Sequence, residues 1–323
     1  METAVPPTLP DPDSWAEALK VLGLRERTAD WLALVCRHGG VFTRRQFCDR
    51  YACRRNAAHR FVGRLARAGL AREYRRPGGR TNGTYCHIRD SSPYHVLGLG
   101  PQFARPPRSP TLLWRRLLGL DYVLERHDSD WLHTEEDLVA HFTHVGVRPG
   151  VLPKREFKGA VGKTVRRFPM RYPIDSDGWE WSTFVFVDPG YDTTVPLGYW
   201  ADTHRRLWNG LRRRGIEVHV VAAVRSHAAA QRARNRLKHW TGYYSDAALT
   251  HDEWWLLEDI ETAIDANDPS VFDEWGGFRR AMRLRAPLRR RADAADKGNG
   301  RIDSYSTHVA VRLGDPCVDA RLY

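Results

Sequence analysis

Apolar side chains in the first hundred residues recur at helical spacing and then give way to two short strand-like segments. The spacing predicts three helices, over residues 24–38, 44–51 and 54–68. Thr43 is a favourable N-cap for the second helix, and Gly69 follows the third, where glycine commonly ends a helix. Residues 70–75 and 84–88 predict strands, and the turn-forming residues between them predict a hairpin.

From residue 111 onward, helical and strand-like segments are interleaved, which predicts an α/β or α+β arrangement. The predicted helices cover residues 112–127, 134–145, 199–214 and 226–239, and the predicted strands cover residues 166–174, 182–187 and 217–224. The helix at residues 199–214 lies between the last two strands. We therefore expect these strands to pair in parallel, because a helix is the usual crossover between parallel strands.

Proline and glycine are concentrated at the N-terminus and again at residues 98–110, where they exclude regular helix. The predicted organisation is a flexible tail over residues 1–14, a first domain over residues 15–97, a linker over residues 98–110, an α/β domain over residues 111–225, and a helical C-terminal extension with a polar, mobile end over residues 226–323. The chain is thus expected to place a small domain in front of a larger α/β (α+β) domain.

The positive charge of the chain is concentrated in the first predicted domain. The whole chain has a net charge of +12, and the segment from Val21 to His95 contains 16 arginines and five acidic residues, a surplus of +11. A general preference for arginine over lysine explains the residue type but not the shortage of acids. The first domain is therefore predicted to bind a polyanion.

The segment GVFTRRQFCDRYACRRNAAHRFVGRLARAGLAREY resembles the second and third helices of winged helix-turn-helix DNA-binding proteins. The likeness lies in a short helix and turn before a longer helix that ends in Arg64-Leu65 and Gly69-Leu70, with a basic hairpin beyond. It implies that the third helix enters the major groove of double-stranded DNA. A homodimer is expected, because one such helix reads few base pairs and two-fold symmetry doubles the site.

The residues predicted to touch DNA are mostly arginines. With Ala58, Val62 and Leu65 facing inward, the outer surface of the third helix carries Arg54, Arg55, Asn56, His59, Arg60, Arg64 and Arg67. Arg55, Asn56 and Arg60 are expected to contact bases, since arginine can pair bidentately with guanine and asparagine with adenine. The residues expected to contact the DNA backbone are Arg44 and Arg45 in the second helix and Arg75, Arg76 and Arg80 in the hairpin.

A winged helix can also serve as a protein-interaction module, and that alternative predicts a different third helix. Such a helix usually carries acidic or mixed charge. Residues 54–71 of this chain contain no Asp or Glu, which favours DNA as the partner.

Asp175 and Asp188 follow strand-like segments of the larger domain and suggest an alternative function, a metal-dependent nuclease. Nucleases of the restriction-endonuclease fold hold Mg²⁺ with acids on neighbouring strands and place a lysine beside them. Pro189-Gly190 follows Asp188 where that lysine would stand, and both aspartates also fit ordinary turns. The larger domain is therefore expected to be a restriction-endonuclease-like nuclease or a noncatalytic relative, with Mg²⁺ as a cofactor only in the first case.

The segments KTVRRFPMRYPI, STFVFVDPG and LGYWADTHRRLWNGL resemble the C-terminal region of replication-relaxation-type proteins of plasmids and other mobile elements. This resemblance implies a regulatory or accessory DNA-binding role in the maintenance, replication or transfer of such an element. A further alternative makes residues 111–323 a docking module that recruits a protein partner to the DNA.

No apolar stretch approaches the roughly 20 residues that a membrane-spanning helix needs, so we expect a cytoplasmic, nucleoid-associated protein without a membrane partner. The five cysteines are an odd number, which argues against a disulfide framework and for reduced thiols. They include no C-x₂-C pair, so no metal site is expected from them.

Overall fold

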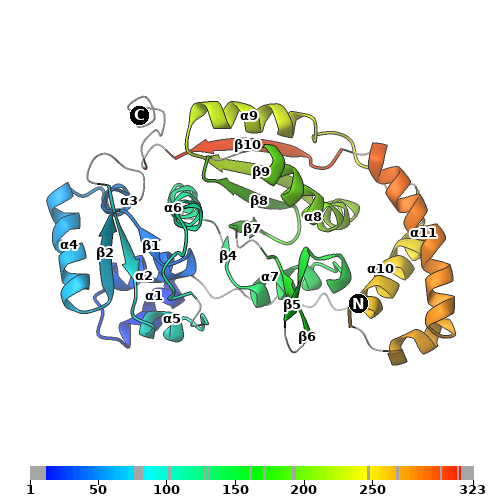
Figure 1. Ribbon diagram of the computed structural model, residues 1–323, viewed down its shortest axis with the longest axis horizontal. Helices are drawn as coiled ribbons and strands as arrows, with labels where there is room; N and C mark the ends of the chain where they lie inside the picture. Colours follow the sequence, from blue (N-terminus) through cyan, green and yellow to red (C-terminus); the bar gives the residue numbers. More distant parts are fainter. Residues whose placement is uncertain are drawn as a thin grey trace.

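Helices and strands are mixed throughout the chain, which confirms the α/β class (Figure 1). The computed structural model describes residues 12–75, 83–100, 103–126, 129, 131–159, 162–169, 172–190, 194–245, 248–266, 269–298, 300–310 and 313. Within these ranges, no helix has both the length and the apolar character that crossing a membrane requires.

The N-terminal unit combines helices with a small antiparallel sheet. Its elements are α1 (Pro12–Lys20), α2 (Glu26–Arg37), β1 (Val41–Phe42), α3 (Arg44–Arg50), α4 (Arg55–Arg67), β2 (Ala71–Arg75), β3 (Thr84–Ile88) and α5 (Ser92–Val96). The sheet has the order β1-β3-β2. The three predicted helices and two predicted strands are present, and their ends agree within two residues. The helix α1 begins inside the expected tail, and β1 is too short to be recognised from a period of two.

An aromatic cluster fixes α2, α3 and α4 against one another. Trp31 of α2 is fully buried, and its ring makes edge contacts with Phe42 and Phe47 at centroid distances of 5.2 and 5.3 Å. Phe47 of α3 stacks on Phe61 of α4 at 4.0 Å. Thr43 caps α3 as predicted and forms a capping box with Gln46. The orientation of α4 is therefore set by rigid ring contacts.

The larger unit is built on a five-stranded sheet in the order β10-β9-β8-β7-β4 (Figure 1). Its strands are β4 (Trp131–Leu132), β7 (Ile174–Ser176), β8 (Trp181–Asp188), β9 (Glu217–Val224) and β10 (Ser304–Val309), and its helices are α6 (Pro110–Leu124), α7 (Glu135–His144), α8 (Thr194–Arg213), α9 (His227–Lys238), α10 (His251–Ala266) and α11 (Phe278–Gly298). Short 3₁₀ helices occupy Pro149–Val151 and Pro269–Trp275. As predicted, β8 and β9 pair in parallel with α8 as the crossover, whereas β7 and β4 join in antiparallel orientation.

Helices α6 and α8 cover opposite faces of this sheet. Phe186 of β8 packs against Trp200 of α8 with ring centroids 5.4 Å apart. The next residue, Val187, points to the other face and lies 3.9 Å from the position that a Cβ on Gly119 of α6 would occupy. Burial on both faces explains why β8 contains an unbroken apolar run instead of an alternating one.

The expected strand over residues 166–174 is wrong. Its first residues belong to β6 (Gly162–Arg167), which forms a separate two-stranded hairpin with β5 (Lys154–Gly159). After β6, the chain returns to the main sheet only at Ile174. Pro169 and Pro173 explain the interruption, because proline has no backbone N–H to donate to a ladder.

The expectation for residues 226–323 is wrong in part. The polar stretch that we expected to be mobile, residues 289–300, includes the last part of α11, and the chain then returns to the sheet as β10. Asp303 fixes this return, since its carboxylate accepts hydrogen bonds from Arg212 of α8 and from the Val218 backbone N–H, both at 2.8 Å. The segment SYSTHV has no apolar signature, so its strand depends on pairing with the edge of β9.

The described residues of the expected linker at 98–110 are packed. Leu99 and Phe103 are buried in the core of the N-terminal unit, together with Leu120 and Leu124 of α6. Val41 of β1 belongs in turn to the core of the larger unit. The two units therefore share a continuous apolar contact around α6.

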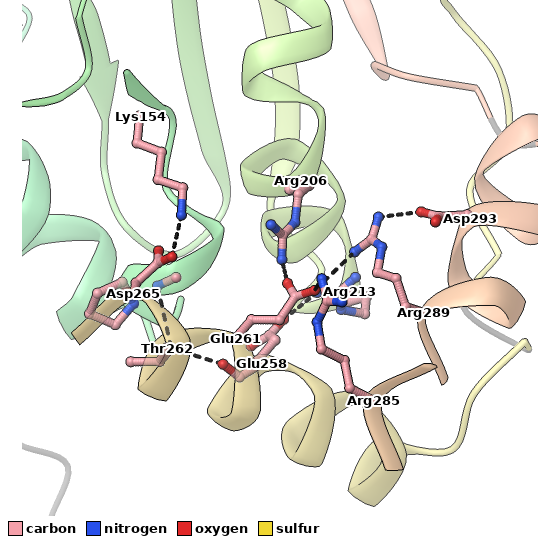
Figure 2. Close-up of polar contacts among 12 residues, drawn as sticks. Lys154, Arg206, Arg213, Glu258, Glu261, Thr262, Asp265, Arg285, Arg289 and Asp293 are labelled. Carbon is pink, nitrogen blue, oxygen red and sulfur yellow. Dashed lines mark hydrogen bonds and ion pairs between the residues drawn. The ribbon is translucent and has the colours of Figure 1, made fainter. Parts of the chain in front are cut away.

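Ion pairs attach α10 and α11 to α8 (Figure 2). Glu258 and Glu261 of α10 are 3% and 4% exposed. Arg213 and Arg206 of α8 pair with these two carboxylates, and Arg285 of α11 reaches Glu261 at 2.9 Å. Three helices thus meet at two buried acids.

Candidate nucleic-acid interface

Helix α4 lies at the outer edge of the molecule, with the larger sheet on the far side of α6 (Figure 1). Its inward side consists of the buried residues Ala58, Phe61, Val62 and Leu65. Three of these were predicted to face inward, and Phe61 completes the apolar stripe. The opposite side of α4 is consequently the side that solvent and a partner can reach.

Every residue predicted to face outward from α4 is exposed: Arg54, Arg55, Asn56, His59, Arg60, Arg64 and Arg67. Arg55, Asn56, His59 and Arg60 are spaced so that they share one face of the helix. Their side chains form no hydrogen bond or ion pair with the described part of the chain. Four polar side chains with unengaged donors therefore stand together near the N-terminus of α4.

Arg54 is the N-cap residue of α4, and the other two exposed arginines contact their own helix. Arg67 donates to the Gly63 carbonyl at 3.3 Å, and the guanidinium of Arg64 lies 5.9 Å from the centre of the Phe61 ring. Both side chains stay exposed. They extend the basic surface along α4 without an acidic residue in that helix.

The arginines predicted to contact the DNA backbone differ in their exposure and in their partners. Arg45 is exposed on α3 and lies 3.9 Å from the Asp49 carboxylate. Arg44 is half-buried and donates to Glu73 of β2 at 2.6 Å, so its guanidinium joins α3 to the hairpin strand. Arg75 is exposed at the end of β2. Arg76 and Arg80 lie outside the described residues.

One further basic residue of this surface was missed. Arg72 of β2 is exposed, and its guanidinium lies 5.4 Å from the centre of the Tyr74 ring. The sequence places Arg72 in the predicted strand over residues 70–75, but AREYR has no alternation of apolar and polar residues that would show which of its side chains stay accessible.

Asp175 and Asp188 are not brought together. Asp175 of β7 is paired with Thr183 of β8, and the distance along β8 from Thr183 to Asp188 is about 16 Å at the rise of a strand. The two carboxylates also point to opposite faces, because Asp188 lies five positions after Thr183 and side chains alternate between the two faces of a strand. The Asp188 carboxylate accepts a hydrogen bond from the Gly190 N–H at 2.8 Å, as expected for a strand-ending turn.

The thiols of the N-terminal unit are in apolar surroundings. Burial raises the pKa of Cys86 to about 12 and also raises the pKa of Cys36 and Cys48. Near pH 7 these thiols are therefore in the protonated form, which is the less reactive one. Among the described residues there is no group of three or more His, Cys, Asp or Glu side chains that could hold a metal ion.

A buried polar contact between the two units was not predicted. Gln46 of α3 donates to the Leu117 carbonyl at 2.9 Å and to Asp121 of α6 at 3.4 Å. The other oxygen of Asp121, which is fully buried, lies 3.2 Å from Nε2 of His308 in β10. The helix α3 is thereby connected through α6 to the edge of the main sheet.

No protein-family model, curated protein or solved structure matches this chain. The resemblances to winged helix-turn-helix proteins and to replication-relaxation-type proteins therefore stay predictions. What the chain does is inferred from the chemistry of its own surface.

Proposed function

We propose that this chain binds double-stranded DNA through a winged helix-turn-helix formed by α2, α3, α4 and the β2–β3 hairpin. Helix α4 would lie in the major groove, and the hairpin would contact the backbone or the minor groove beside it. The observation that carries the proposal is the outer face of α4, which is exposed, rich in arginine and without an acidic residue. Such a face is typical of a helix that approaches a polyanion.

Different residues of this face have different proposed roles. Arg55, Asn56 and Arg60 would read base edges, because the N-terminal part of a recognition helix usually approaches the bases. Arg45, Arg72 and Arg75 would bind phosphates and fix the position of the domain on the duplex. A dimer on a two-fold symmetric site would supply the length of sequence that one α4 cannot read.

The test compares variants of the full chain on labelled duplex DNA from the protein's own upstream region. The double variant Arg55→Ala/Arg60→Ala removes two of the base-contacting arginines, and we expect it to lose about 2–6 kcal/mol of binding free energy. The matched control is Arg279→Ala/Arg283→Ala, which removes the same charge from exposed positions on α11, at the other end of the molecule (Figure 1). Binding by the first variant as tight as the wild type's would refute the assignment of α4.

For biological role, we propose a regulator or accessory factor of a mobile element. The support is the resemblance of the larger domain to replication-relaxation-type proteins, together with the DNA-binding surface of the N-terminal unit. The separation of Asp175 and Asp188 gives the nuclease alternative no support. Incubation of supercoiled DNA with the protein and Mg²⁺ or Mn²⁺ tests this point, since nicking that disappears in Asp188→Asn would favour the nuclease after all.

A further inference from the structure

A cavity of about 290 Å³ lies where the N-terminal unit meets the larger sheet. Its wall is formed by the end of α2, by α6, by the segment from β4 to α7 and by the residues before β7. Gly119 of α6 lines it, as do residues of both units. Its volume is close to the lower end of the usual range for small-molecule sites, about 300–1,000 Å³.

Three residues that line this cavity carry buried polar atoms with no partner. The Tyr172 hydroxyl, Nε of Arg115 and Nε2 of His38 make no hydrogen bond with the described part of the chain. Tyr172 is itself only 8% exposed. Leaving such groups unsatisfied costs free energy, and a ligand in the cavity could supply the missing partner to all three.

The charge around the cavity is positive. Arg37, Arg115 and Arg116 line it, and no Asp or Glu is among the described residues of its wall. Arg116 is held in place because it donates to the carbonyls of Gly39 and Arg105 at 2.9 and 3.0 Å. A guanidinium held in position beside a largely apolar cavity favours an anion.

The other titratable groups of the wall do not reverse this charge. Burial lowers the pKa of His38 to about 3 and that of His133 well below its ordinary value, so both rings are neutral near pH 7. Burial raises the pKa of Tyr172 to about 12. Its hydroxyl is therefore protonated and can donate a hydrogen bond to an anion.

The remaining wall is apolar. Leu132, Leu138 and Val187 line it and are nearly inaccessible to solvent. We propose that the cavity binds a small organic anion, whose carboxylate or phosphate accepts hydrogen bonds from Arg115 and Tyr172 and whose apolar body lies against these side chains. This site goes beyond DNA binding and does not depend on it.

The probes are 2-naphthoate, 2-naphthyl phosphate and the neutral 2-naphthamide, titrated into the full chain without DNA by isothermal calorimetry. We expect at least one anion to bind at a single site with a Kd below about 1 mM, and the amide to bind at least tenfold more weakly. The better anion of the two identifies carboxylate or phosphate as the group that the site selects. The proposal is overturned if the amide binds as tightly as both anions, or if none of the three probes binds.

Substitutions of two residues that line the cavity test whether the anion binds there. Tyr172→Phe and Arg115→Met should each weaken the better anion at least tenfold, whereas Arg279→Met, at an exposed position of α11, should leave it unchanged. Without a ligand, Tyr172→Phe should melt at the same temperature as the wild type or higher, because it removes an unpaired buried hydroxyl. A lower melting temperature for Tyr172→Phe, or unchanged anion binding in both variants, would show that these groups serve the fold and not a ligand.

Discussion

Asn56 on α4 and Arg45 on α3 are both exposed, but the DNA-binding proposal predicts different consequences of losing them. We expect Asn56→Ala to weaken binding to the preferred duplex by about 1–3 kcal/mol and to leave binding to unrelated DNA unchanged, because a base contact carries sequence specificity. Arg45→Ala should weaken both and reduce the salt slope of log Kd by roughly 1, since it removes one phosphate contact.

Fluorescence anisotropy with both duplexes at several salt concentrations measures these quantities. If Asn56→Ala loses the same binding free energy on both duplexes, Asn56 contacts the DNA backbone and not a base. Arg279→Ala serves again as the control for a lost surface charge.

His204 is a single residue that makes stability depend on pH. It is 2% exposed and packs between the rings of Trp200 and Trp208. Burial lowers its pKa from 6.5 to about 4. The unfolded chain therefore binds this proton more readily, so the free energy of unfolding falls as the pH drops from about 6.5 towards 4, by about 2 kcal/mol at pH 5 from His204 alone.

Urea unfolding at pH 7 and pH 5 tests this prediction. The variant His204→Phe cannot titrate at this position and should lose less stability between the two pH values than the wild type does. Other buried histidines still titrate in this variant: burial lowers the pKa of His38 to about 3 and those of His87 and His141 to about 4, so part of the pH dependence remains. An unchanged difference in the variant would mean that His204 does not carry this effect.

At the scale of elements, the attachment of α10 and α11 to α8 rests on the buried acids in Figure 2. Glu258 pairs with Arg213, the last residue of α8, and with Arg214, which follows it, and the Glu258 side chain is 4% exposed. Glu258→Gln should lower the free energy of unfolding by about 3–5 kcal/mol, because the variant leaves buried guanidinium groups without a counter-charge. Thermal or urea unfolding followed by circular dichroism measures the loss.

The same helix provides a matched control. Glu253 pairs with Arg291 near the surface, and Glu253→Gln should change stability little, since solvent screens an exposed ion pair. Equal effects of the two substitutions would show that burial does not determine the strength of this attachment.

At the scale of the whole molecule, the shared core around α6 predicts that both units unfold together. Leu120 of α6 is fully buried in the core of the N-terminal unit, although its helix covers the larger sheet. Leu120→Ala should cost about 2–5 kcal/mol and reduce hydrogen-exchange protection in α2 and in β9 alike. Leu284→Ala, at an exposed position of α11, is the control. Loss of protection in α2 alone would mean that the units unfold separately.

The sequence by itself determined the features that depend on neighbouring residues. The buried and exposed sides of α4 follow from the period of a helix, so the positions of Arg55, Asn56 and Arg60 were predictable. The parallel pairing of β8 and β9 was predictable as well, since two apolar segments flank an amphipathic helix. In these elements the spacing of the apolar residues predicts which side is buried.

Only the tertiary structure decided which distant segments meet. The strand β10 is polar and exists because the edge of β9 offers it backbone partners. Asp121 and His308 are 187 residues apart and contact each other only after β10 has joined the main sheet and α6 has packed against it. Arg115 and Tyr172, each with a buried polar atom that lacks a hydrogen-bond partner, come to line one cavity for the same reason. The partners of a residue depend on the surfaces that fold against it, and the local sequence pattern does not contain those surfaces.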